Sequence, residues 1–98
     1  MNPNNQLPAI HPGEFLAEIL EDTPMTLANF SRSIGVPTIK IAAILQGTES
    51  ITVELSLLFG KAFGQSPQYW LNLQTAYDLK TVSQETRNHL NEVIYLFA

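Results

Sequence analysis

Apolar side chains recur every three or four residues along most of this chain, the spacing that places them on one face of a helix. The first such stripe consists of Phe15, Leu16, Ile19 and Leu20. Pro12 suits the first position of a helix, where its missing N–H costs nothing, and Pro24 forbids continuation. The pattern therefore predicts a helix that begins near Pro12 and ends near Asp22.

Five more helices are predicted by the same spacing and by residues that begin or end helices. The side chains suited to cap an N-terminus are Thr26, Thr52, Ser66 and Ser83. The glycines suited to end a helix are Gly35, Gly47 and Gly64. The predicted helices span residues 26–35, 37–47, 52–64, 66–77 and 83–97. We find no convincing strand, although the final residues VIYLFA are ambiguous, so the expected fold is all-α.

The stretch NFSRSIGVPTIKIAAILQGTESIT has the layout of a helix-turn-helix. Gly35 can adopt the positive φ of the turn, and Ser31 is small where the two helices must touch. Ile41 and Ile44 can anchor the second helix, while Val36 can plug the turn. On this spacing alone an ordinary helical hairpin with the same caps remains the alternative.

The length of 98 residues fits one domain, preceded by a loose arm at residues 1–10 that contains two prolines. The absence of cysteine excludes disulfides and thiolate metal sites. His11 and His89 have no partner at helical spacing, so no metal site is indicated, and we expect no cofactor. No glycine-rich phosphate loop, nucleophile elbow or carboxylate pair is found, so an enzyme is the least expected class.

No apolar run approaches the length of a membrane span, and the N-terminus lacks the features of a signal peptide, so we expect a cytoplasmic protein without a membrane partner. The net charge of −4 argues against non-specific binding of nucleic acid. It leaves room for a specific DNA contact through a local surface, or for an acidic face that binds a basic protein.

The third predicted helix and its surroundings supply the candidate DNA contacts. These are Arg32, Thr38, Ile39, Lys40, Ala42, Ala43, Gln46 and Thr48. Contacts to phosphate need Lys, Arg or N–H donors, and this set contains few cations. Ile39, Ala42 and Ala43 could contact thymine methyl groups, but such contacts discriminate weakly between bases. We therefore expect DNA reading that is weak or depends on a partner. Arg32 and Lys40 could equally be ordinary solvated charges.

Three further features of the sequence each allow two interpretations. Glu14, Glu18 and Glu21 share a helix face that is either solvated or a docking strip. Trp70 could stack on single-stranded nucleic acid, but its place in an apolar stripe without nearby basic residues favours the core. The apolar residues near the C-terminus are Leu90, Val93, Ile94 and Phe97. They either fold back or join a second copy, and we favour dimerisation because a two-fold operator needs a two-fold protein.

Four stretches resemble the HigA-type antitoxins, also called plasmid-maintenance antidote proteins, of the Cro/C1-type helix-turn-helix superfamily. They are HPGEFLAEIL at 11–20, GVP at 35–37, GTESIT at 47–52 and FGQSPQYWLNLQTAYDL at 63–79. The likeness covers residues 9–80, and the combination of HPGE with SPQYWLNLQ makes it specific.

The resemblance implies a lambda-repressor-like five-helix DNA-binding domain over residues 11–80 with an added C-terminal helix over 81–98. It also implies a homodimer that represses its own operon by binding double-stranded operator DNA. Such proteins neutralise a small basic toxin, commonly a ribosome-dependent mRNA interferase. The resemblance makes Glu14, Glu18 and Glu21 a candidate strip for that toxin.

This sequence departs from the family at the end of the third helix, which usually reads N-G-K-R. Here the corresponding residues are Gln46, Gly47, Thr48 and Glu49. The departure puts strong DNA binding in doubt because it removes two cations. Two alternatives therefore stay open: a protein-binding module without sequence-specific DNA binding, and an orphan Cro/C1-type regulator without a toxin.

Overall fold

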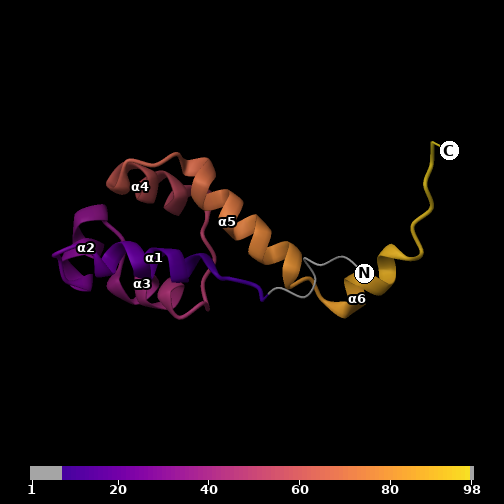
Figure 1. Cartoon of the computed structure of the whole chain (residues 1–98), viewed down its shortest axis with the longest axis horizontal. Helices are drawn as coiled ribbons and strands as arrows, with labels where there is room; N and C mark the ends of the chain where they lie inside the picture. Colours follow the sequence, from indigo (N-terminus) through magenta and orange to yellow (C-terminus); the bar gives the residue numbers. More distant parts are fainter. Residues whose placement is uncertain (1–7, 98) are drawn as a thin grey trace.

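The computed structural model describes residues 8–97, and within them it contains six helices and no strand. The helices are α1 (Pro12–Glu21), α2 (Leu27–Ile34), α3 (Thr38–Leu45), α4 (Val53–Phe63), α5 (Pro67–Lys80) and α6 (Gln84–Leu90). The prediction of an all-α fold is confirmed. Of the arm predicted at residues 1–10, residues 1–7 lie outside the described part. Figure 1 shows α1 to α4 gathered in a bundle, with the second half of α5 leading away from it to α6.

Helix ends lie where the capping residues predicted them. The side chains of Thr26, Thr52 and Ser83 each accept a hydrogen bond from the backbone N–H three residues later, and Ser66 from that of Gln68. Gly35 and Gly64 end α2 and α4 in the left-handed conformation, with φ of 71° and 69°. These ends follow from local chemistry, which explains why the sequence predicted them well.

A buried cluster from α1 to α5 forms the core. Its members are Leu16, Phe30, Ile41, Ile44, Ile51, Leu55, Phe59 and Trp70. Trp70 is fully buried, its ring meets Phe59 edge-on at 5.1 Å, and its Nε1 donates to Oε1 of Gln65 at 2.9 Å. Trp70 is therefore a core residue, and the stacking platform considered for it is excluded.

The predicted sixth helix is wrong in its extent, because α6 ends at Leu90 and leaves Val93, Ile94 and Phe97 outside it. No residue of α6 is buried, and Arg87 holds the helix to α5 by donating to the carbonyl oxygens of Leu79 and Lys80 at 3.4 Å. A short helix without a packed face is marginal in water, and the β-branched residues that follow favour extended backbone. The apolar spacing alone could not show that nothing covers this segment.

Two glycines within helices lie directly against backbone atoms of other segments. A Cβ on Gly13 of α1 would overlap the carbonyl oxygen of Ile44 in α3, and a Cβ on Gly60 of α4 would lie 2.6 Å from the carbonyl oxygen of Gln65. The first contact is the more important for function because it fixes how close the two helices lie. Any side chain at Gly13 must push α1 and α3 apart.

We predict that Gly13→Ala lowers the free energy of unfolding by about 1–3 kcal/mol, because overpacking moves backbone rather than a flexible side chain. Urea unfolding of the variant measures the change. Glu18→Ala is the matched control on the same helix, where the exposed side chain should change the stability by less than about 0.5 kcal/mol. If Gly13→Ala were as stable as the control, α1 and α3 could not lie this close.

Candidate nucleic-acid interface

The turn between α2 and α3 has the geometry that a helix-turn-helix requires. Gly35 and Val36 donate their N–H groups to the carbonyl oxygens of Arg32 and Ser31 at 3.2 and 3.0 Å, which closes α2. Val36 packs against the core, as predicted, and Ser31 is 1% exposed where a small residue was expected. The Oγ of Ser31 is buried without a hydrogen-bond partner among the described residues.

Helix α3 is anchored on one side and open on the other. Ile41 and Ile44 are fully buried, whereas Ile39 is 81% exposed. Ala42 and Ala43 are half-buried, and Gln46 is exposed just after the last turn. Positions 39, 42, 43 and 46 follow helical spacing and share one face, here named the outer face of α3. The helix is thus neither sunk in the fold nor covered by another described element.

The other four residues predicted to contact DNA lie around the outer face of α3 and differ in their exposure and hydrogen bonds. Thr38 is exposed at the first helical position, and Lys40 is half-buried beside a hollow of about 310 Å³ that Glu54 also lines. The hydroxyl of Thr48 donates to the carbonyl oxygen of Ala43 at 3.1 Å. Arg32 is exposed on α2 and donates to Oδ1 of Asn29 at 3.2 Å.

His11 and Gln74, for which no structural role was predicted from the sequence, hold the start of α1 and the loop after α3. Nδ1 of His11 accepts the N–H of Gly13 at 2.9 Å and caps α1, while the imidazole meets Tyr77 edge-on at 4.9 Å. Gln74 of α5 accepts the N–H of Ile51 at 2.7 Å. Both contacts connect α5 to residues far away in the sequence, so no local pattern predicted them.

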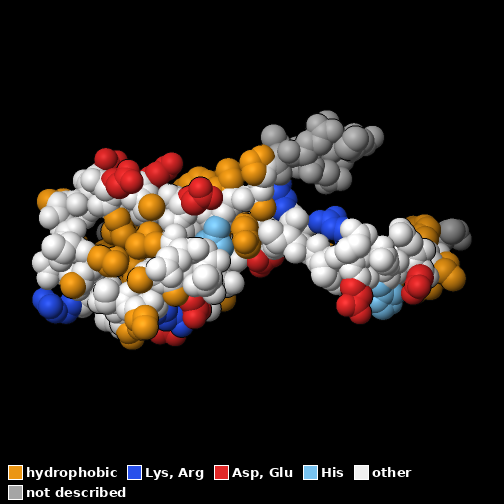
Figure 2. Space-filling model, turned by 90° about the horizontal axis from the view of Figure 1, so that it is seen from below, with side chains coloured by type: hydrophobic (Ala, Val, Ile, Leu, Met, Phe, Trp, Pro, Cys, Tyr) orange, Lys and Arg blue, Asp and Glu red, His pale blue; other side chains and the backbone are white. Residues whose placement is uncertain are grey.

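The acidic strip of α1 is exposed, as a solvated or docking face requires, with Glu14, Glu18 and Glu21 all open. Beyond Glu21 lies a groove of about 320 Å³ that Leu20, Met25 and Leu45 also line. Figure 2 shows acidic side chains along one edge of the bundle and apolar side chains in the hollow beside them. An acidic border therefore runs next to an apolar surface.

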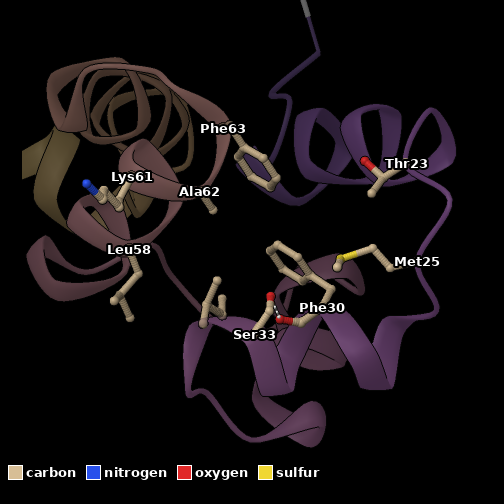
Figure 3. Close-up of a pocket in the computed structure, with 9 residues that line it drawn as sticks. Thr23, Met25, Phe30, Ser33, Leu58, Lys61, Ala62 and Phe63 are labelled. Carbon is tan, nitrogen blue, oxygen red and sulfur yellow. Dashed lines mark hydrogen bonds between the residues drawn. The ribbon is translucent and has the colours of Figure 1, made fainter.

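Met25 also lines a second hollow, of about 450 Å³, between α2 and α4. Figure 3 shows Phe30 and Ser33 entering it from α2, and Leu58, Lys61 and Phe63 from α4. The rings of Phe30 and Phe63 stack with their centroids 5.5 Å apart. The hollow is therefore lined mainly by apolar side chains, and Lys61 is the one cation among its lining residues.

The C-terminal segment is the most apolar exposed part of the described chain. Leu90, Val93, Ile94 and Phe97 are 63–84% exposed, and the neighbouring Tyr95 and Leu96 are equally open. Figure 1 shows this segment far from α2 and α3. The four predicted dimerisation residues therefore lie together along the chain and are covered by nothing described in the same copy.

Within residues 8–97, no helix has the length and apolar character needed to cross a membrane. No three His, Cys, Asp or Glu side chains of this same part lie together as metal ligands would.

Comparison with known proteins gives the family. No protein-family model matches the sequence. The chain is 37% identical over 93 residues to virulence-associated protein I of Dichelobacter nodosus, covering 94% of this chain and 85% of that protein. Among solved structures it is similar to antitoxin GraA in complex with its operator, with a TM-score of 0.83, 32% identity and coverage of 94% and 95%.

A solved addiction module antidote protein of the HigA family from Coxiella burnetii is 36% identical, with a TM-score of 0.81. The alignment covers 93% of this chain and all of that one. Both the identity and the coverage extend over the helix-turn-helix and the helices that hold it. The chain belongs to the HigA family of helix-turn-helix antitoxins.

Proposed function

We propose that this protein is a DNA-binding antitoxin that represses its own operon through α3 and neutralises a small basic toxin. The observation that carries the proposal is the outer face of α3, which is open opposite the buried Ile41 and Ile44. A helix in this position can enter the major groove while the bundle stays outside. The related antitoxin GraA was solved in complex with its operator, which supports the same use here.

We assign the base-facing role to Ile39, Ala42, Ala43 and Gln46. Thr38 lies at the N-terminus of α3, and Lys40, Arg32 and Thr48 flank the helix, so they would contact the sugar-phosphate backbone. With two cations among eight residues, a single copy would bind DNA weakly. We further propose that the protein acts in the cytoplasm, because its proposed target, the operator of its own gene, lies there.

A titration of the duplex upstream of its own gene tests the DNA-binding role. Binding should survive excess random DNA and weaken with added salt, because phosphate contacts release counterions. Ala43→Glu should weaken it by at least about ten-fold, since a carboxylate then faces the bases and phosphates. Thr75→Glu adds the same charge at an exposed position of α5 and should bind like the wild type. Equal loss in both variants, or no binding by the wild type, contradicts the assignment.

We further propose that Leu90, Val93, Ile94 and Phe97 join two copies. Burying one such side chain contributes about 1.5–3 kcal/mol, so the segment has enough apolar surface to stabilise a dimer. A two-fold protein would place two copies of α3 on two half-sites and compensate for the few phosphate contacts of each. The exposure of all four side chains in the single copy supports this role.

Replacing Ile94 by Asp should convert the dimer to monomers, because a buried unpaired carboxylate is costly. Sedimentation velocity measures the mass, and operator binding should weaken in parallel. Leu79→Asp is the matched control, since it replaces another exposed apolar side chain by the same charge, on α5 and outside the proposed contact. A wild type that is monomeric at micromolar concentration, or an Ile94→Asp dimer, would contradict the dimerisation segment.

We propose that the basic toxin docks on Glu14, Glu18 and Glu21, with an apolar side chain in the groove beside Glu21. The acidic strip supplies charge complementarity, and the groove lined by Leu20, Met25 and Leu45 supplies apolar contact. The second candidate function, a protein-binding module without DNA binding, would use the same surface, and the DNA titration distinguishes the two.

The double substitution Glu18→Lys with Glu21→Lys should weaken binding of the protein encoded by the adjacent reading frame by about ten-fold or more, through repulsion of its basic surface. Calorimetry measures the affinity, while operator binding should be retained. Glu85→Lys together with Glu92→Lys makes the same charge change near α6 and serves as control. If the wild type does not bind that protein, the orphan-regulator alternative is favoured; if the α1 variant binds it normally, the strip is misplaced.

A further inference from the structure

The outer face of α3 offers groups that suit only one kind of base pair. We infer that α3 reads thymine methyl groups and adenine edges, so that the half-site in front of it consists mainly of A·T pairs. This inference rests on the proposed DNA-binding function and adds to it the class of sequence that is recognised.

Ile39 contributes most to this selection of A·T pairs. It is 81% exposed, whereas Ile41, Ile44 and the partly buried Leu45 pack into the core from this helix, so Ile39 takes no part in the core of the domain. A β-branched residue is also a poor choice for an exposed helix position. Against DNA, however, its side chain would meet an apolar surface, and the thymine 5-methyl is the apolar group that base edges present in the major groove.

Ala42 and Ala43 also favour A·T pairs, because their side chains have no hydrogen-bonding group. They follow Ile39 by three and four residues and are half-buried, so each shows a Cβ methyl and little else. Short side chains let α3 approach the base edges closely. A methyl cannot accept from cytosine N4 or donate to guanine O6, so neither alanine can recognise a G·C pair by hydrogen bonding.

Gln46 adds the one directional group of the outer face, seven residues after Ile39 and exposed. Its amide can donate to adenine N7 and accept from adenine N6 at the same time, which is the arrangement that selects adenine. Gln46 would thus contact adenine, while the apolar side chains contact thymine methyl groups. Both members of an A·T pair are then recognised.

The cations that could read guanine lie beside the outer face of α3 and not at its centre. Lys40 lies one residue from Ile39, hence about 100° around the helix, and is half-buried beside the hollow that Thr52 and Glu54 line. Arg32 lies on α2, where its guanidinium donates to Asn29. The cations can therefore contact phosphates, while sequence selection depends on methyl groups and one amide.

The test starts from a random-sequence duplex library, from which the wild type selects its sites. A·T pairs should be enriched in each half-site. The selected duplex is then made with uracil in place of thymine, which removes only the 5-methyl groups. Wild-type affinity should fall by about three- to ten-fold per half-site. The Ile39→Ala variant should bind the thymine duplex more weakly and be much less sensitive to the uracil exchange.

Val53→Ala is the matched control, because Val53 is an exposed apolar residue on α4, 63% open, and should keep the full uracil sensitivity. A separate duplex with 7-deazaadenine tests Gln46 by removing N7. If the wild type binds selected sites but tolerates uracil, or selects G·C pairs there, this inference fails and DNA binding stands. If no sequence is enriched, the DNA-binding proposal itself fails, and this inference fails with it.

Discussion

The contact between Gly13 of α1 and the carbonyl oxygen of Ile44 in α3 is the constraint on which the rest of the arrangement depends. It brings two backbones together with no side chain between them, so α3 cannot move inward. His11 caps the same end of α1, and its ring lies beside Gly47 just after α3. These contacts fix the position of α3, the proposed recognition helix, and a site that binds through shape needs such support.

The sequence predicted the local features of the fold and missed those that depend on distance. Thr26, Thr52 and Gly35 act within a few residues, so their roles could be inferred from composition and spacing. The contact of Gln74 with Ile51 joins residues that are 23 positions apart, and no periodicity shows it. The end of α6 at Leu90 was also missed. The apolar pattern suggested that the residues after Leu90 are buried on a helix face, but no described part of the bundle covers them.

The candidate DNA surface was predictable for the same reason as the caps. A 3.6-residue period separates the buried Ile41 and Ile44 from Ile39, and the structure confirms that separation. The functions of the acidic strip and of the C-terminal segment could not be inferred from the sequence alone, because each depends on the surface of a partner. The structure narrows the question by showing both of them open and an apolar groove beside Glu21.

The scarcity of cations around α3 also bears on how the protein finds its target in a genome. A net charge of −4 gives random DNA little attraction for it, so long sliding on non-specific sequence is disfavoured. The protein would then reach the operator mostly by direct collision from solution. Association would be slower, but little of the protein would be bound to non-specific DNA. Occupancy of the operator would in that case follow the cellular amount of free antitoxin closely.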